Sequence, residues 1–355
     1  MEIYTGNSLQ EKLHNVPEKR RHCWHELMDY LRKPNDGRIC GIGGLIETGK
    51  TTMMSQAIQE IGQFDNCLLI ECGQEDNLQE IRDALNLHSS CKYIFIDDFA
   101  KINGIGGCSV LADRYAYEGR KIVVTSDELM LFQLLQAYIL LDRMHLIDTT
   151  YVSFSEFHEL ADAGLKDYIR GYELFHQAVD LPRNIMKSYR LMGQKPPVRE
   201  LSIANALHYA ASKYYFDEKY DSDFEVALKV CCRAGFLQNC NGNYVFLRPC
   251  VPYWFRAGLE LSDEFVYRMI LKNIVLLYLF RKYNSRDIKV KAYDEYVLKE
   301  DLVSTETIVY QFAEHEIEIQ TREKIEKKSG TRIKDIVLVT MENAELLLRG
   351  EYIDR

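Results

Sequence analysis

The sequence predicts an α/β protein whose first half forms a doubly wound parallel sheet. Short apolar runs that suit buried strands alternate there with stretches of helical periodicity, the pattern of a parallel sheet covered on both faces. A glycine-rich turn joins the first of these strands directly to a helical stretch. The chain has 355 residues, more than one hydrophobic core usually supports, so we expect further domains after the sheet.

Five strands and four helices are expected in this first half. The strands are expected at Arg38–Ile42, Cys67–Glu71, Tyr93–Asp97, Lys121–Thr125 and His145–Asp148. The helices are expected at Thr51–Ile61, Gln79–Leu87, Cys108–Tyr117 and Glu128–Leu141. We expect residues 1–36 to form an N-terminal helical segment, and residues 37–160 to form the domain built on the sheet.

The turn after the first strand carries a phosphate-binding motif. Residues 44–51 are Gly-Leu-Ile-Glu-Thr-Gly-Lys-Thr, which matches the P-loop pattern G-x-x-x-x-G-K-[ST] in its required context of strand, loop and helix. Lys50 would reach the β- and γ-phosphates, and the Thr51 hydroxyl would ligate magnesium. Backbone N–H groups and the helix N-terminus would face the phosphates. The residues expected to bind the nucleotide are Gly44, Glu47, Thr48, Gly49, Lys50, Thr51 and Thr52.

One residue of the loop is unusual for a phosphate site. Glu47 carries a carboxylate, which repels phosphate if it faces the ligand. We therefore expect the Glu47 side chain to point outward while its N–H group still faces the nucleotide.

Two acidic residues end the third strand. Asp97 and Asp98 follow the apolar run Tyr93–Ile96, and carboxylates at the carboxyl end of such a strand lie where ligands bind in open α/β sheets. Asp97 would hold magnesium, through water, and Asp98 would polarise the attacking water. Asp98 is shorter than the more usual glutamate, which favours slow hydrolysis.

Two further residues are candidates for contact with the transferred phosphate. Ser126 follows the fourth strand and could sense the γ-phosphate; the alternative is that Ser126 or Asp127 only caps the next helix. Arg143 precedes the fifth strand and could neutralise charge in the transition state. An ordinary surface or salt-bridged arginine is the alternative for Arg143.

The second half has a different pattern. Helices are expected at Phe154–Tyr172, Asp180–Leu191, Arg199–Tyr214, Asp223–Ala234 and Phe265–Lys282, and strands at Phe236–Gln238, Tyr244–Leu247, Ile288–Tyr293, Thr307–Phe312, Glu316–Gln320 and Ile336–Thr340. Asn241-Gly242 is a strong hairpin dipeptide, so residues 195–260 show the helix, helix, hairpin order of a winged helix. Residues 161–194 are expected to be a helical linker, and residues 261–355 a small α+β domain.

At this point the chain resembles the prokaryotic AAA-type P-loop ATPases that carry a C-terminal domain related to PD-(D/E)XK nucleases. The resemblance is clearest over residues 17–160 and rests on the P-loop, Ile94–Asp98, Val123–Leu129, Asp142–Ile147 and Val152–Phe157. It implies an ASCE/AAA-like P-loop NTPase fold, followed by a winged-helix region and a nuclease-like domain. ATP rather than GTP is favoured by the resemblance, and because we find no guanine-reading motif.

The resemblance also implies where a nuclease site would lie. A metal-binding Asp would be followed by Glu-x-Lys on the next strand, and the nearest match is Asp301 with Glu318-Ile319-Gln320, where Gln replaces the lysine. Glu326-Lys327-Lys328 does spell Glu-x-Lys, but lies in an expected charged helix at Arg322–Lys328. We therefore expect a degenerate, inactive nuclease fold that serves as an interaction surface.

Charge and composition narrow the partners. The net charge is −9, and the winged-helix segment from Pro196 to Cys250 has six basic and six acidic residues, whereas a DNA-reading module is usually clearly basic. Nucleic acid is therefore not favoured, and a protein partner through the C-terminal half is. The N-terminus carries no secretory signal pattern and the apolar runs are too short to span a bilayer, so we expect a cytoplasmic protein that makes no membrane contact.

Three functions remain open on the sequence. The first is a slow Mg-dependent ATPase whose nucleotide state controls the contacts of the C-terminal half. The second is a nucleotide-gated switch with negligible turnover, which Asp98 in place of a glutamate leaves open. The third is a DNA-processing ATPase with an active nuclease-like domain, which the missing strand-borne Glu-x-Lys and the acidic charge oppose.

Overall fold

The computed structural model describes residues 1–34, 36–171, 181–212, 223–249, 251–252, 263–293, 296–312 and 319–351. The chain divides into two compact units. The N-terminal unit comprises Met1–Val152, Asp180–Glu200 and Arg233–Gly235, and the C-terminal unit comprises Ser153–Val179, Leu201–Cys232 and Phe236–Arg355.

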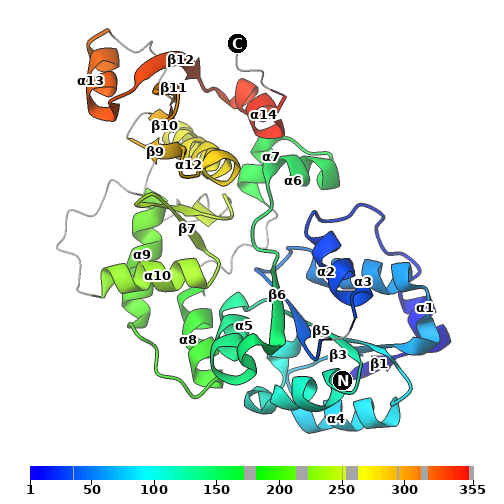
Figure 1. Cartoon of the computed structure of the whole chain (residues 1–355). Coiled ribbons are helices and arrows are strands. Elements are labelled where there is room, and N and C mark those ends of the chain that lie inside the picture. Colours follow the sequence, from blue (N-terminus) through cyan, green and yellow to red (C-terminus); the bar gives the residue numbers. More distant parts are fainter. Residues whose placement is uncertain are drawn as a thin grey trace. The chain divides into compact units, whose positions relative to one another are not determined.

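A six-stranded sheet with the order β1-β3-β4-β5-β2-β6 is the centre of the N-terminal unit (Figure 1). Its strands are β1 (Glu2–Tyr4), β2 (Ile39–Gly43), β3 (Cys67–Glu71), β4 (Tyr93–Asp97), β5 (Lys121–Ser126) and β6 (Met144–Asp148). The five strands from β2 to β6 are parallel, which confirms the predicted parallel sheet. β1 pairs antiparallel with β3. It lies in the segment that we expected to be helical. The sequence did not predict this strand, because three residues are too few to show a strand period.

Helices cover both faces of this sheet. They are α1 (Gly6–Lys12), α2 (Trp24–Arg32), α3 (Lys50–Ile61), α4 (Leu78–Leu87) and α5 (Leu129–Leu135). A further helix of this unit, α8 (Leu181–Leu191), packs against α5. Alternation along β3 explains the two layers: Cys67 and Leu69 pack with α1, α2 and α3, whereas Leu68 and Ile70 pack with α4 and α5. Strands buried on both faces in this way have the near-continuous apolar sequences from which they were predicted.

Two predicted helices of this unit are present but are only partly α-helical. The 3-10 turn η3 (Ile105–Gly107) precedes the segment Cys108–Tyr117, which is helical from 109 to 116, mostly as the π-helical turn η4 (Leu111–Ala116). The segment Glu128–Leu141 divides into α5, the π-helical turn η5 (Gln136–Leu140) and the 3-10 turn η6 (Leu141–Arg143). Leu141 has a φ of 51°, which reverses the chain directly before β6. A further 3-10 turn, η1, spans Phe64–Asn66, and η2 spans Phe99–Lys101.

The C-terminal unit begins with two short helices in place of the expected single one. α6 (Phe154–Ala161) ends because Asp162 adopts a left-handed φ of 53°, and α7 (Leu165–Arg170) follows. Next come α9 (Glu200–Ser212), α10 (Phe224–Arg233), β7 (Leu237–Cys240) and β8 (Asn243–Phe246). β7 and β8 form an antiparallel hairpin through Asn241 and Gly242, whose φ angles of 53° and 89° suit this dipeptide.

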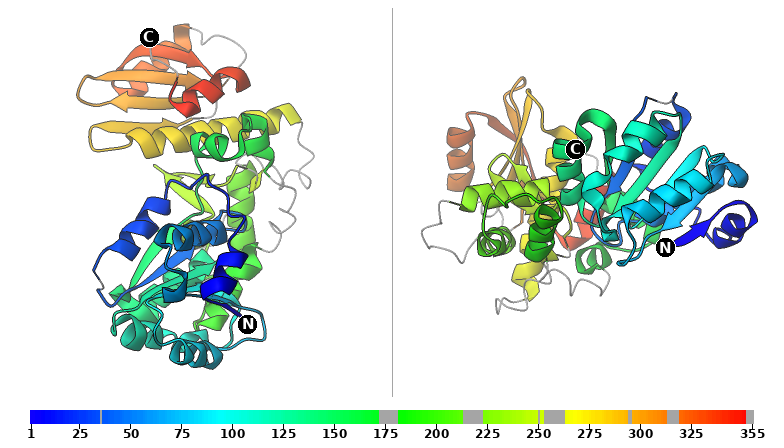
Figure 2. Two further views of the ribbon diagram at one scale, coloured as in Figure 1. Left: turned by 90° about the vertical axis from the view of Figure 1, so that its right-hand side faces the viewer. Right: turned by 90° about the horizontal axis from the view of Figure 1, so that it is seen from below.

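The remainder of the C-terminal unit is a four-stranded sheet of order β12-β11-β10-β9 with helices packed against it (Figure 2). Its elements in chain order are α12 (Asp263–Tyr283), β9 (Ile288–Ala292), β10 (Tyr296–Asp301), β11 (Glu306–Gln311), α13 (Ile319–Ser329), β12 (Arg332–Leu338) and α14 (Met341–Arg349). β10 was not predicted. The predicted strand Glu316–Gln320 is wrong where it can be compared, since Ile319 begins α13; Glu316 to Glu318 lie outside the described residues. Among the described residues, no helix is long and apolar enough to cross a membrane.

Candidate functional site

The P-loop lies at the carboxyl edge of the six-stranded sheet. β2 ends at Gly43, which pairs with Ser126 of β5 on one side and Asp148 of β6 on the other. The loop then rises from between these two strands and enters α3 at Lys50. The strand connections diverge at this point, the position where open α/β sheets bind ligands.

The backbone of the loop explains its glycines. Gly49 directly precedes α3 with a φ of 80°, a conformation that favours glycine. At Gly44, an added Cβ would lie 2.2 Å from the Thr149 Oγ1 atom. Glu47 also has a positive φ, 61°, and its side chain is exposed, as we expected.

Neighbouring segments hold the loop in shape. The Thr48 and Thr149 hydroxyls are 2.7 Å apart and hydrogen-bonded. The buried Arg21 guanidinium donates to the carbonyl of Thr48, to that of Thr149 at 3.3 Å and to that of Tyr151 at 3.0 Å. Arg21 therefore links the P-loop to the segment that follows β6.

Lys50 is folded back into the loop and is buried. Its Nζ atom donates to the Leu45 carbonyl at 2.7 Å and forms an ion pair with Asp127 Oδ1 at 2.6 Å. Burial of the ammonium group lowers the pKa of Lys50, and the Asp127 carboxylate acts in the opposite direction. The group that would meet the phosphates is thus paired with a carboxylate of the protein.

Asp97 lies beside Thr51 at the start of α3. The Thr51 hydroxyl donates to Asp97 Oδ2 at 2.9 Å, and the Thr125 hydroxyl, on the neighbouring strand, donates to Asp97 Oδ1. Burial raises the pKa of the Asp97 carboxyl, and the hydrogen bonds from Thr125 and Thr51 oppose the rise. A hydroxyl and a carboxylate at this distance are the hard oxygen ligands that Mg²⁺ prefers, so the residues fit the ion.

The neighbouring Asp98 forms an ion pair with a lysine instead of a hydrogen bond with Thr51. It has a φ of 56°, and its N–H group donates to the Thr125 hydroxyl at 2.9 Å. Its carboxylate forms an ion pair with Lys101 Nζ at 2.6 Å. To polarise a water molecule, Asp98 would have to release Lys101 first.

Of the remaining predicted residues, Ser126 and Thr52 lie close to the P-loop, whereas Arg143 does not. Ser126 is buried at the end of β5, and its Oγ atom accepts the N–H of Glu128 at 2.9 Å. This bond gives Ser126 the local role at the start of α5 that was the alternative to phosphate sensing. Thr52 lies in the first turn of α3, behind Lys50 and Thr51.

The structure places Arg143 away from the P-loop. Arg143 immediately precedes β6, and the first residue of that strand, Met144, pairs with Ile39, whereas Gly43 pairs with Asp148. Arg143 therefore lies at the opposite edge of the sheet, five residues before Asp148 and about 16 Å away along the strands. Its guanidinium pairs with Asp113 and donates to the Ile139 and Leu140 carbonyls, both at 3.1 Å. Arg143 is therefore a salt-bridged arginine, the alternative that the sequence left open, and it does not reach the P-loop of its own chain.

Three residues of the cluster were not in the predicted set: Arg21, Thr125 and Asp127. Thr125 and Asp127 lie in the segment that drew attention to Ser126, but the sequence does not show which of these side chains turns toward the loop. Arg21 lies between β1 and β2 in a segment without a motif, so only the fold reveals its contacts.

The predicted nuclease residues have structural roles where they are described. Asp301 Oδ1 accepts the N–H groups of Val303 and Ser304 at 2.9 and 3.0 Å, which shapes the turn after β10 and lowers the pKa of the Asp301 carboxyl. Glu326 lies on α13, as expected, and its Oε1 atom accepts the N–H of Ile333 at 2.9 Å. Glu318 lies outside the described residues, and the side chains of Gln320 and Lys328 are not described.

Comparison with known proteins identifies no family for this chain and finds several solved structures of low sequence identity. No protein-family model matches the chain, and no curated protein is significantly similar to it. The Walker-type ATPase paby2304 of Pyrococcus abyssi is 14% identical, with 69% of this chain and 99% of that chain covered and a TM-score of 0.40. The Aeropyrum pernix ORC2 protein is 10% identical over 73% and 100% of the two chains, with a TM-score of 0.37. AMPPCP-bound DnaA from Aquifex aeolicus is 15% identical over 72% and 94%, with a TM-score of 0.31.

The class of the N-terminal unit follows from its own strand order and loop. A parallel sheet with the P-loop sequence between β2 and α3, and an acidic residue at the end of β4, defines a P-loop domain of the α/β class.

Proposed function

We propose that this protein binds Mg-ATP at the P-loop and hydrolyses it slowly, and that the nucleotide state controls what its C-terminal half contacts. The observation that carries the proposal is the convergence of Lys50, Thr51 and Asp97 at one edge of the sheet, with Thr51 Oγ1 2.9 Å from Asp97 Oδ2. Lys50 would bind the β- and γ-phosphates, and Thr51 and Asp97 would hold the magnesium ion. Magnesium would neutralise phosphate charge.

The state of Lys50 sets what nucleotide binding must change. Its ammonium group is already paired with Asp127 and the Leu45 carbonyl, so incoming phosphates would exchange one set of partners for another. The Asp127 carboxylate would then face phosphate oxygens of the same sign, and we expect it to move toward solvent. This exchange supplies a local change through which nucleotide could act on the rest of the chain.

Slow turnover is favoured by the ion pair between Asp98 and Lys101. Asp98 must release Lys101 before its carboxylate can polarise a water molecule. A nucleotide-gated switch with negligible turnover is therefore the second candidate, and the same ion pair favours it. Phosphate release in Lys101→Met separates the two: a rise in rate that Asp98→Asn abolishes supports slow hydrolysis through Asp98.

The remaining parts of the proposal concern the C-terminal unit. We propose that its helix, helix, hairpin segment is winged-helix-like and that the α-β-β-β-α-β segment from α12 to β12 is a degenerate nuclease-like fold that contacts a protein. The turn role of Asp301 supports the absence of cleavage. Metal-dependent nicking by the full chain that Asp301→Ala abolishes would instead revive a DNA-processing enzyme.

Thermal unfolding with and without Mg-ATP tests the central proposal. Nucleotide at about a hundredfold its dissociation constant should stabilise the native protein by about 2.7 kcal/mol, and Lys50→Ala should lose the shift. Thr51→Val, which removes only the hydroxyl, should retain binding of ATP without magnesium and lose the gain that magnesium adds. If the folded wild-type protein shows no shift, the P-loop does not bind nucleotide usefully by itself.

A further inference from the structure

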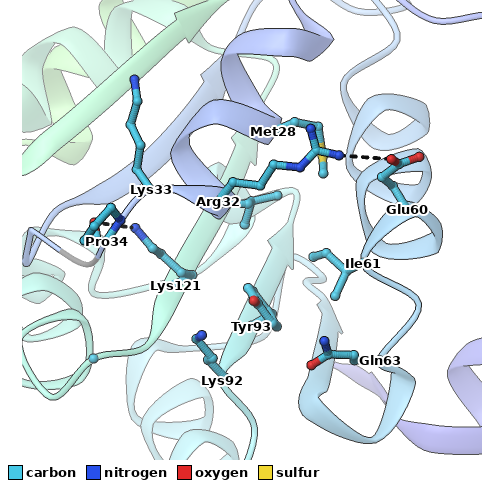
Figure 3. Close-up of a pocket in the computed structure, with 12 residues that line it drawn as sticks. Met28, Arg32, Lys33, Pro34, Glu60, Ile61, Gln63, Lys92, Tyr93 and Lys121 are labelled. Carbon is cyan, nitrogen blue, oxygen red and sulfur yellow. Dashed lines mark hydrogen bonds and ion pairs between the residues drawn. The ribbon is translucent and has the colours of Figure 1, made fainter.

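A second candidate site lies in the N-terminal unit, at the amino edge of the sheet and away from the P-loop (Figure 3). It is a half-open pocket with a volume of about 600 Å³. One wall is formed by the first residues of β4 and β5, and the other by the ends of α2 and α3. Its size is within the range of small-molecule sites.

The lining of this pocket is strongly basic. Arg32, Lys33, Lys92 and Lys121 line it, against one carboxylate, Glu60. Glu60 is already bound by two arginines, Arg20 and Arg32, each at 3.0 Å. In a chain with a net charge of −9, a concave surface with this excess of cations is not a consequence of overall composition.

Lys121 is the residue that points most directly to a ligand. It is 3% exposed, its Nζ atom donates to the Pro34 carbonyl at 3.3 Å, and it lies 4.6 Å from the centre of the Tyr30 ring. Within the described residues, no carboxylate is near enough to form an ion pair with it. Lysines are almost never fully buried unless paired, and an ammonium group has three donors, of which the Pro34 carbonyl uses one.

The C-terminal ends of the two helices account for only some of the cations in this pocket. The carbonyl ends of α2 and α3 favour nearby cations, and the bond from Lys121 to Pro34, just beyond α2, is of this kind. Lys92 is different, because it precedes β4 and its Nζ atom lies 5.3 Å from the centre of the Tyr93 ring. Figure 3 shows Lys92, Tyr93 and Lys121 together on the strand side of the pocket, across from Glu60 on α3.

We propose that this pocket binds a small organic phosphate the size of a mononucleotide, with its phosphate on Lys92 and Lys121 and its planar part against Tyr93. Lysine binds phosphate as a point charge, whereas the fork of an arginine matches both carboxylate and phosphate. The arginine of this pocket, Arg32, is already committed to Glu60. The site is separate from the P-loop and does not depend on the function proposed there.

Calorimetry with the full chain tests this proposal. The protein should carry Lys50→Ala, so that phosphate binding at the P-loop is suppressed, and the probes are AMP, inorganic pyrophosphate and, as the uncharged control, adenosine. Loss of one charge-assisted hydrogen bond corresponds to about a tenfold weaker affinity or more. We therefore expect Lys121→Met to weaken AMP binding by about tenfold or more, and exposed Lys92→Met by a smaller factor.

A matched variant controls for general electrostatics. Arg114→Gln removes one positive charge from an exposed site of the same unit that does not line the pocket, and should leave AMP affinity unchanged. Lys92→Met keeps the test valid if Lys121→Met does not fold. The proposal is overturned if neither AMP nor pyrophosphate binds, if adenosine binds as well as AMP, or if Arg114→Gln weakens binding as much as Lys92→Met.

Discussion

Two buried lysines lie at opposite edges of the same sheet and are stabilised in different ways. Lys50, at the carboxyl edge, pairs with the Asp127 carboxylate at 2.6 Å. Lys121, at the amino edge, donates to a carbonyl and lies over an aromatic ring. Burial lowers the pKa of both side chains.

The two lysines differ in whether a carboxylate of the protein pairs with them, and therefore in how each would meet a ligand. At the carboxyl edge a carboxylate of the chain occupies the lysine, so a ligand must compete with it. At the amino edge Asp36 attracts the ammonium group only from beyond ion-pair distance, so an anionic ligand would supply a direct partner for the buried charge. A P-loop motif identifies the first lysine in the sequence, whereas the second is evident only once the strands and helices are placed.

The sharpest test of this comparison replaces each lysine by methionine and measures Mg-ATP affinity. Lys50→Met removes charged hydrogen bonds to the phosphates, and we expect a loss of about a hundredfold or more. Lys121→Met should leave Mg-ATP affinity at the P-loop unchanged. Equal losses in the two variants, measured by equilibrium binding on protein shown to be folded, would contradict the separation of the two sites.

A glycine substitution tests how closely the carboxyl edge is packed. Gly44→Ala would place its Cβ 2.2 Å from Thr149 Oγ1, so the loop or Thr149 must move. We expect the free energy of unfolding to fall by about 1–3 kcal/mol. Gly106→Ala is the matched control, because nothing lies within 4 Å of its added Cβ, and it should change stability by less than about 0.5 kcal/mol. Equal effects of the two substitutions in urea unfolding would refute the packing argument.

Asp97 gives the carboxyl edge a dependence on pH. Burial raises the pKa of its carboxyl in the folded protein, so above about pH 4, the ordinary pKa of Asp, the folded state keeps a proton that the unfolded chain has lost. The nucleotide-free protein should therefore lose stability as pH rises from that value through the folded-state pKa. Asp97→Asn removes this loss and should be more stable than wild type at neutral pH, by about 0.5–2 kcal/mol, and not near pH 4. Thermal unfolding of both proteins from about pH 4 to neutral pH, without nucleotide, measures this difference in stability. A stability advantage of Asp97→Asn that grows toward acid pH would contradict the prediction.

The sequence predicts the elements whose signals are local. The strands from β2 to β6 are apolar runs, and Lys50, Thr51 and Asp97 come from a motif and a strand end. The bond from Lys50 to Asp127 depends on which way the chain turns after β5, and the three contacts of Arg21 join segments that are far apart in sequence. The position of Arg143 away from the P-loop follows from the predicted strands alone, because a residue before a parallel strand lies at the amino edge.

The smallest effect is expected at the carboxylate that occupies Lys50. Asp127→Asn removes the charge that competes with the phosphates, so nucleotide should bind more tightly. The Asp127 side chain is 41% exposed, so the ion pair is screened by water and contributes about 0.2–1 kcal/mol, up to about a fivefold gain in affinity. Asp36→Asn, which removes an exposed carboxylate elsewhere in the unit, should have no effect. Titration with a fluorescent ATP analogue at low salt distinguishes the cases: unchanged affinity in Asp127→Asn would mean that the carboxylate leaves Lys50 without cost, and weaker binding would mean that Asp127 helps to hold the nucleotide.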